Sequence, residues 1–216
     1  MKSAIVITGT DTDIGKTVFA AALCEALGGS YWKPVQAGTQ GGTDRETVRR
    51  LTGLGEERLP AERYVLSQPL SPHRAAELDG ITIDFEALTR LPPSPGPGPL
   101  IIEGAGGLMV PLTREHLVID LVGRWQAPVV LCARTALGTI NHSLLSIEAL
   151  KRRAIPIVGI AFIGHAMADT ERTIIDFAGV KRLGRLSQLP SLEPASLKSA
   201  FAANFVAADF LASADA

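Results

Sequence analysis

The chain has 216 residues, a length that favours a single domain over residues 1–216 and allows about 70% of the unfolded surface to be buried. Its formal net charge of −1 argues against a nucleic-acid binder, because no basic surplus is present to displace counterions from a phosphate backbone. No run of about 18 apolar residues predicts a membrane span, and no cleavable signal fits ahead of the first strand.

The first predicted element is a buried strand over residues 3–8, whose centre is an unbroken β-prone apolar run. The segment Gly9-Thr-Asp-Thr-Asp-Ile-Gly15-Lys16-Thr17 follows at once, and the apolar residues 18–27 after it predict a helix. Strand, glycine-bounded turn, Gly-Lys-Thr and helix form the context that a phosphate-binding P-loop requires. The alternative is an ordinary connection that happens to contain Gly-Lys-Thr.

The chemistry of such a loop is local. Backbone N–H groups converge on phosphate oxygens at the positive end of the helix dipole. Lys16 would add a full positive charge at the outer phosphates, and the Thr17 hydroxyl would be a ligand for Mg²⁺. Five residues separate Gly9 from Gly15 where the common motif has four, so Thr10 occupies the usual position of the first glycine. We therefore expect a protein that binds a nucleoside triphosphate.

Strands and helices alternate along the rest of the chain. This order predicts an α/β fold of the P-loop NTPase type, a mostly parallel sheet with helices on both faces and the ligand at the carboxyl ends of the strands. A capping box, Thr43 to Glu46, opens one helix, and the proline-rich residues 92–99 predict a stiff surface connection. The predicted strands are 30–33, 100–103, 128–133, 157–163 and 180–186; the predicted helices are 44–54, 71–77, 81–91, 116–125, 141–152 and 170–177, and Phe201, Phe205 and Leu211 continue a helical spacing in the tail.

Three charged residues follow predicted strands or open a helix. Lys33 ends a strand, although a surface lysine is the commoner outcome, and Asp44 could simply complement a helix dipole in the first turn. Glu103 ends an apolar strand ahead of Gly104-Ala-Gly-Gly107, the place where a P-loop protein puts a Mg²⁺-organising acid. The N–H groups of residues 138–142, ahead of a helix, could hold a carboxylate.

Two cysteines, Cys24 and Cys132, lie in apolar runs and are expected to be core residues of a reduced protein, with neither a disulfide nor a metal role. His73 and His142 are interpreted as surface or capping residues. We therefore expect a cytoplasmic protein without a membrane or nucleic-acid partner.

Five ordered motifs together resemble the dethiobiotin synthetase family of biotin biosynthesis. They are residues 9–17, 32–38 (Trp-Lys-Pro-Val-Gln-Ala-Gly), 71–73 (Ser-Pro-His), 103–107 (Glu-Gly-Ala-Gly-Gly) and 137–142 (Leu-Gly-Thr-Ile-Asn-His). The resemblance covers residues 1 to about 165, and the long glycine spacing of the P-loop is usual in this family.

The resemblance implies a homodimeric P-loop enzyme that closes a ureido ring. Its substrates would be 7,8-diaminononanoate, CO₂ or bicarbonate, and ATP with Mg²⁺. An amine would capture CO₂ as a carbamate, and the γ-phosphoryl group would activate the carbamate as a mixed anhydride. Attack by the second amine would then give dethiobiotin, ADP and phosphate.

The resemblance also implies roles for individual residues. Lys16 would bridge carbamate and γ-phosphate, with Lys33 as the second catalytic cation, while Thr17, Asp44 and Glu103 would organise Mg²⁺. Substrate contacts would come from Thr10, Asp11, Lys33 and Ala37, and from Gly138, Thr139, Ile140 and Asn141 of the neighbouring subunit. Nucleotide contacts would come from Asp13, Ile14, Gly15, Lys16, Thr17, Asp44, Glu103, Gly104, Ala105, Gly106, Ile163, Gly164, Leu189 and Pro190, the last two covering the base.

The sequence departs from the family pattern at two places. Some relatives carry a hydroxyl residue where this chain has Ala37, so that substrate contact is lost or passes to the backbone or Thr39. Some carry Asn-Asp where this chain has Ile163-Gly164. Because the side-chain amide is absent there, the preferred nucleotide base stays open.

Two other function classes are weighed against this one. A regulatory ATPase of the partitioning or septum-positioning type carries a second lysine early in its P-loop, where this chain has Asp11, and its membrane-binding members end in a basic amphipathic helix. This chain has no Lys or Arg after Lys198. A different amide-forming ligase on the same fold is compatible with the same Mg-ATP chemistry.

Overall fold

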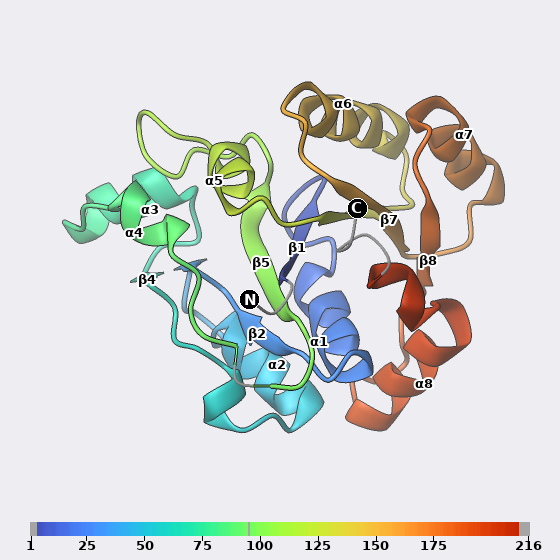
Figure 1. The fold of residues 1–216 in the computed structure, drawn as a ribbon, viewed down its shortest axis with the longest axis horizontal. Helices are drawn as coiled ribbons and strands as arrows, with labels where there is room; N and C mark the ends of the chain where they lie inside the picture. Colours follow the sequence, from blue (N-terminus) through green and yellow to red (C-terminus); the bar gives the residue numbers. More distant parts are fainter. Residues whose placement is uncertain (1–3, 95, 212–216) are drawn as a thin grey trace.

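The computed structural model describes residues 4–94 and 96–211, and its centre is a six-stranded sheet with strand order β2-β5-β1-β6-β7-β8 (Figure 1). Every pair of neighbouring strands in this sheet is parallel, which confirms the predicted fold class. The strands are β1 (Ala4–Gly9), β2 (Ser30–Trp32), β5 (Leu100–Gly107), β6 (Val129–Arg134), β7 (Ile157–Ile163) and β8 (Arg182–Leu186).

Helices cover both faces of the sheet (Figure 1). One layer consists of α1 (Lys16–Ala26), α2 (Asp44–Thr52) and α8 (Pro194–Asn204), which contact one another. The other consists of α5 (Val118–Trp125), α6 (Thr139–Arg152) and α7 (Ala168–Ala178), of which α6 and α7 pack together. Within the described residues, no helix has the length and apolarity that crossing a membrane would need.

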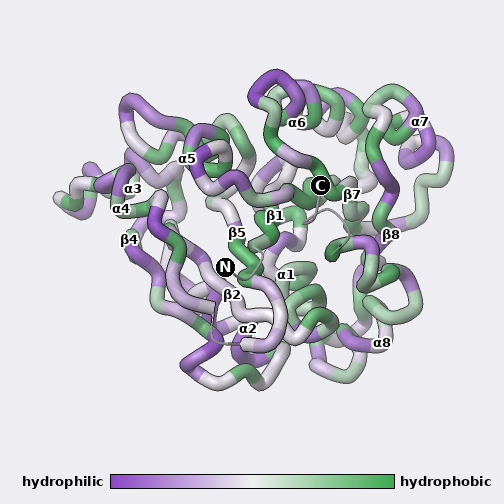
Figure 2. Tube along the Cα trace, in the orientation of Figure 1, coloured by the Kyte–Doolittle hydropathy of each residue, from purple (hydrophilic) through white to green (hydrophobic). Residues whose placement is uncertain are grey.

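The hydrophobic core is divided by the sheet into two clusters. Val6 belongs to the cluster beneath α5 and α6, whereas Ile5 and Ile7 belong to the cluster beneath α1, α2 and α8. Successive strand residues point to opposite faces, and both faces are buried, so the central strands read as continuous apolar runs. Figure 2 shows these apolar positions on the central strands and the polar positions in the outer loops.

A small second sheet lies beside the carboxyl ends of the large one, and the sequence does not predict it. It pairs β3 (Val35–Ala37) with β4 (Tyr64–Leu66) in parallel; α3 (Pro72–Asp79) packs on both of these strands, and α4 (Phe85–Thr89) packs on α5. The predicted strands include none between residues 34 and 99, which is wrong, because three-residue strands are too short to show a periodicity. The short 3₁₀ helices η1 (Glu56–Arg58) and η2 (Ala207–Phe210) are also unpredicted.

Several predicted boundaries shift for local reasons. The helix predicted over residues 81–91 begins only after Asp84, whose carboxylate accepts the N–H of Ala87 and caps the helix. The capping box of α2 is confirmed, since the Thr43 hydroxyl accepts the N–H of Glu46 and the Glu46 carboxylate accepts the N–H of Thr43. The strand expected to end at Glu103 continues to Gly107, which pairs with Gly9 of β1.

The tail packs differently from its predicted helical spacing. Phe201 and Phe205 are buried and stack with ring centroids 4.9 Å apart, and Phe205 also contacts Phe19 of α1. The third apolar anchor is Phe210, because the helix ends at Asn204 and the chain then turns, which leaves Leu211 exposed. The tail therefore completes the core beneath α1.

The proline-rich connection runs over the end of α1, where the Gly98 N–H donates to the carbonyl of Gly28. Residue 95 of this connection lies outside the described residues.

Candidate active site

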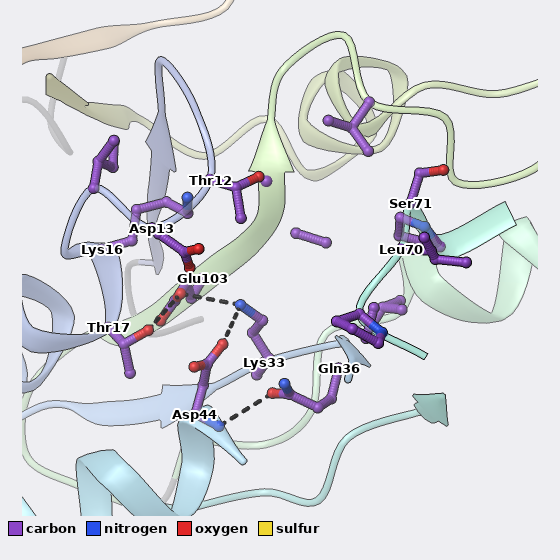
Figure 3. Close-up of a pocket in the computed structure, with 18 of the residues that line it drawn as sticks. Thr12, Asp13, Lys16, Thr17, Lys33, Gln36, Asp44, Leu70, Ser71 and Glu103 are labelled. Carbon is purple, nitrogen blue, oxygen red and sulfur yellow. Dashed lines mark hydrogen bonds and ion pairs between the residues drawn. The ribbon is translucent and has the colours of Figure 1, made fainter. Parts of the chain in front are cut away.

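A cavity of about 760 Å³ opens at the carboxyl ends of β1, β2 and β5. The P-loop lies on one side of this cavity, and Leu70 and Ser71 lie on the opposite side (Figure 3). Predicted site residues that line it are Asp13, Ile14, Gly15, Lys16, Thr17, Lys33, Ala37, Asp44, Glu103, Ala105 and Gly106.

The P-loop has the backbone that its glycines predict. Gly15 lies in the left-handed region with φ 94° immediately ahead of α1, and Asp13 also has a positive φ, of 53°. A Cβ at Gly9 would lie 2.4 Å from Ile14 Cδ1 and 3.1 Å from the carbonyl oxygen of Asp11, so a larger residue there would require the Ile14 side chain to move. Lys16 is buried, and its Nζ donates to the carbonyl of Asp11 at 2.8 Å.

Lys33 joins two carboxylates that come from different elements. Its Nζ atom lies 2.6 Å from Asp44 Oδ2 and 3.0 Å from Glu103 Oε1 (Figure 3). Thr17 Oγ1 donates to the same Glu103 oxygen at 3.0 Å. The surface alternative for Lys33 is therefore wrong, because its side chain is only 6% exposed.

Burial affects the two lysines differently. Burial alone would lower the pKa of Lys33, but the carboxylates of Glu103 and Asp44 outweigh it and raise that pKa above its usual value. Burial lowers the pKa of Lys16, and Lys33 acts in the same direction while Glu103 opposes both. Lys33 is thus a firmly protonated cation inside the cavity.

The oxygen atoms around Lys33 suit a hard divalent cation. The Thr17 hydroxyl and the carboxylates of Asp44 and Glu103 converge on one wall, and Mg²⁺ prefers such ligands. Among the described residues, no group of three or more His, Cys, Asp or Glu could hold a metal alone. The residues present fit Mg²⁺ that takes its remaining ligands from water and phosphate oxygens.

Other predicted site residues lie outside the lining of this cavity. Thr10 is held by β6, since its N–H donates to the carbonyl of Cys132, and the Asp11 side chain is exposed 3.6 Å from Arg134. Gly104 is an interior residue of β5. Gly138 to Asn141 form the start of α6, and Leu189-Pro190 follows β8.

Ile163 and Gly164, at the end of β7, lie beside the P-loop and not in the cavity lining. A Cβ added to Gly15 would lie 3.1 Å from Ile163 Cγ2. Gly164 has φ 126°, and a Cβ there would come within 2.6 Å of Thr135 Oγ1. The Asn-Asp pair of some relatives would therefore need a different arrangement here.

Several residues of the site are not predicted by the sequence. Gln36 accepts the N–H of Asp44 at 3.1 Å and so fixes the start of α2, and Ser71 lines the opposite wall; both stand inside the quoted motifs. Arg134 donates to the carbonyl of Thr12 at 2.9 Å, and only its place at a strand end pointed to it. Thr12, Val35 and Pro72 also line the cavity and stand inside the quoted motifs. The other lining residues, which carried no signal, are Val18, Pro69, Leu70 and Val110.

Tyr31 is a further missed residue. Its hydroxyl donates to Glu103 Oε2 at 2.8 Å, and the whole side chain is buried. Strand alternation could have found it, because residues 31 and 33 project to the same face of β2.

A parallel sheet that presents Lys16 and Thr17 at the head of the helix after a central strand defines a P-loop nucleotide-binding protein. A family model described as an AAA domain matches residues 3–196. The septum site-determining protein MinD of Pyrococcus horikoshii, complexed with Mg-ADP, has a TM-score of 0.53 at 12% identity and covers 93% of this chain and 94% of its own. The Pyrococcus furiosus cell division ATPase MinD reaches 0.54 at 13% identity, with coverage of 97% and 99%. Identities this low establish the fold alone.

Much closer relatives carry the printed name ATP-dependent dethiobiotin synthetase BioD. The protein of Afipia carboxidovorans is 58% identical over 212 residues, 98% of this chain and 100% of the relative. That of Rhodopseudomonas palustris strain BisB5 is 60% identical over 211 residues, 98% of each chain. A Bradyrhizobium protein is 59% identical over 210 residues, 97% of this chain and 99% of the relative. The chain belongs to the dethiobiotin synthetase family and not to the partitioning-type ATPases.

Proposed function

We propose that the chain makes dethiobiotin from 7,8-diaminononanoate, CO₂ and ATP with Mg²⁺. The observation that carries the proposal is identity of 58–60% to ATP-dependent dethiobiotin synthetases over nearly the whole chain. The convergence of Lys16, Lys33, Thr17, Asp44 and Glu103 on one cavity supports it independently.

The proposed reaction has three bond-forming steps. A substrate amine adds to the carbon of CO₂ and loses a proton, which gives a carbamate. A carbamate oxygen then attacks the γ-phosphorus of ATP, the bond to the β-phosphate oxygen breaks, and ADP leaves. Finally the second amine attacks the carbonyl carbon of the mixed anhydride, phosphate leaves with the bonding electrons, and the amine releases a proton.

Both buried lysines suit this sequence because negative charge is present on the carbamate and on the transferring phosphoryl group. Lys16 follows the P-loop and would contact carbamate and γ-phosphate together. Lys33 stays protonated next to Glu103 and Asp44, so it offers a preorganised positive charge without a proton-uptake step. Holding both amines and the carbamate in one cavity supplies the proximity that ring closure needs.

Thr17, Asp44 and Glu103 would hold Mg²⁺, which when bound neutralises charge on the β- and γ-phosphate oxygens. Gln36 supports this role, because its side chain accepts the N–H of Asp44 and donates to the carbonyl of Gly38 at 2.9 Å. The start of α2 is thereby fixed relative to β3.

The wall opposite the P-loop fits the aliphatic part of the substrate. Val35, Ala37, Pro69, Leu70 and Val110 give this wall an apolar surface. Thr39 is not among the lining residues, so we propose that no side-chain hydroxyl replaces the one that some relatives carry at position 37.

The substrate carboxylate would be held by a second copy of the chain. The first N–H groups of α6 lie at the positive end of the helix dipole. The N–H of Thr139 already donates to the carbonyl of Ala136 at 3.2 Å, so we propose that those of Ile140 and Asn141 hold the carboxylate. Leu137, Ile140 and Leu145 are exposed apolar residues at or near this helix start, which supports a protein interface there. We propose a homodimer in which each α6 start closes the cavity of its neighbour.

The residues proposed to contact the nucleotide base have no side-chain hydrogen-bonding groups that could distinguish one base from another. Ile163 and Gly164 offer the base only backbone groups, with Leu189 and Pro190 as the proposed cover. Selection of ATP over GTP or CTP is measured by comparing their kcat/KM values.

The single domain and the cytoplasmic location are also proposals. The two core clusters lie on opposite faces of the same sheet, which supports our proposal of a single domain over residues 1–216. Cys24 and Cys132 are free and buried, as suits a reducing compartment.

The decisive experiment incubates the protein with diaminononanoate, ¹³C-bicarbonate and Mg-ATP. Mass spectrometry should find the cyclic urea carrying one ¹³C, together with ADP and phosphate. Triphosphate hydrolysis without the labelled urea would overturn the proposed function and favour another amide-forming ligase.

A further inference from the structure

The side chain of Tyr31 lies beneath the cavity, out of contact with solvent. Its register partner in β5 is Ile101, so Glu103, two residues further along β5, projects to the same face of the sheet. The Tyr31 hydroxyl reaches Glu103 Oε2 at 2.8 Å from below the cavity wall.

The two oxygens of Glu103 have different partners. Oε1 accepts hydrogen bonds from Thr17 Oγ1 and Lys33 Nζ, each at 3.0 Å, and it faces the cavity (Figure 3). Oε2 accepts from the phenol of Tyr31. Burial and the nearby Glu103 both raise the pKa of Tyr31 well above its usual value, so the phenol remains a donor.

Packing alone does not fix how a glutamate carboxylate is turned. Its last torsion joins a tetrahedral to a planar carbon and has a broad energy profile, unlike the staggered torsions nearer the backbone. A hydrogen-bond donor behind the carboxylate removes this freedom. Without the donor, Oε2 would be a buried oxygen with no partner and would compete for Thr17 and Lys33.

We propose that Tyr31 is a positioning residue that fixes the Glu103 carboxylate with Oε1 toward Thr17 and the proposed Mg²⁺ position. This inference rests on the proposed function in one respect, because Glu103 is taken as a metal-organising acid. It adds a residue from the core that touches neither substrate nor nucleotide and acts through Glu103.

The test compares Tyr31→Phe with Tyr64→Phe. The chain has two tyrosines, and Tyr64 also uses its hydroxyl in one hydrogen bond, accepting the N–H of Asp84 outside the cavity. Each variant loses one phenol oxygen and one hydrogen bond, but Tyr31 is fully buried whereas Tyr64 is partly exposed, so the stability of each variant is measured separately. Urea unfolding verifies that both variants are folded before the kinetic comparison.

For Tyr31→Phe, the Mg²⁺ concentration giving half-maximal turnover at saturating ATP should rise at least about tenfold, the scale for losing one hydrogen bond to a charged group. The maximal rate should largely recover at high Mg²⁺. Tyr64→Phe should keep the wild-type Mg²⁺ requirement. A folded Tyr31→Phe with an unchanged Mg²⁺ requirement would overturn the positioning role.

A second measurement needs neither turnover nor removal of the Tyr31 hydroxyl. Uniform 3-fluorotyrosine labelling of Tyr64→Phe leaves one ¹⁹F probe, at position 31. Adding Mg²⁺ to the complex with a non-hydrolysable ATP analogue should shift this resonance, and EDTA should reverse the shift. If Mg²⁺ does not shift the resonance and the wild-type protein still makes the cyclic urea, the positioning role of Tyr31 is rejected and the proposed function stands. Failure of the wild type to make the urea, with the Mg²⁺-dependent shift intact, would reject only the proposed reaction.

Discussion

At the residue scale, the site contains two lysines and two carboxylates, which come together at the wall of the cavity. Lys33 stands between Asp44 and Glu103, and Lys16 lies among the same groups with a lowered pKa caused first by burial. Removing one partner of a buried ion pair leaves the other charge without compensation, so such residues affect both stability and catalysis.

We expect Lys16→Ala and Lys33→Ala each to lower the rate of dethiobiotin formation by at least about 10², because each removes a preorganised electrostatic donor. Steady-state product formation measures this. Lys181→Ala is the matched control, since Lys181 pairs with Asp209 at an exposed position far along the chain and should leave the rate unchanged. Near-wild-type turnover in Lys33→Ala would show that its catalytic role is wrong.

At the element scale, two glycines next to or within helices differ in whether they can be replaced by alanine. Gly15 precedes α1 with φ 94°, and a Cβ there would meet Ile163. Gly123 lies inside α5, where a Cβ would make only an ordinary contact with Ile155 Cδ1 at 3.9 Å.

Gly15→Ala should therefore destabilise the fold by about 1–2 kcal/mol, the cost of a left-handed conformation for an L-residue, and should weaken triphosphate binding. Gly123→Ala should stabilise it by about 0.5–1 kcal/mol, because alanine suits a helix interior better than glycine. Urea unfolding gives both values. Equal effects of the two substitutions would contradict the backbone argument.

At the scale of the whole molecule, the small β3–β4 unit is connected to the large sheet by side chains as well as by packing. Glu77 of α3 accepts from Arg114 at 2.6 and 2.9 Å, across 37 residues of chain, and also from Arg74. These hydrogen bonds, that of Arg114 above all, lower the pKa of Glu77 from 4.5 to about 2.

Because the folded-state pKa is depressed, the stabilisation from Glu77 is complete above pH 4.5 and is lost as the pH falls from 4.5 toward 2. In Glu77→Gln, the free energy of unfolding should therefore fall less between pH 4.5 and pH 2 than it does in the wild type. Urea unfolding at a series of pH values measures this decrease. The effect is small, since the pair is solvent-exposed. Adding Arg114→Gln to the variant should change little more; a fully additive loss would contradict the pairing.

The succession of strands and helices along the chain could be predicted because most strands of the large sheet are apolar runs between turn residues, whereas their order within the sheet came only from the structure. The β3–β4 sheet could not, since its strands have three residues and are half exposed at Tyr64 and Val65. The helical spacing of the tail likewise did not identify the buried residue, which is Phe210 and not the adjacent, exposed Leu211.

Local motifs identified the phosphate loop and Glu103, because the residues of each motif are neighbours in the sequence directly after a predicted strand. Contacts such as that of Thr17 with Glu103, 86 residues apart, leave no local mark. For Tyr31, alternation within the predicted strand 30–33 indicates only that its side chain shares a face with Lys33, and nothing local indicates its contact with Glu103.

The sequence by itself determined the P-loop, the order of strands and helices, and the resemblance to dethiobiotin synthetases, because each depends on residues that are neighbours along the chain. Only the tertiary structure decided that Lys33 lies between Asp44 and Glu103 and that Tyr31 holds the far oxygen of Glu103. The register of β2 against β5 brings these groups together, and register is a property of paired strands that neither strand carries alone.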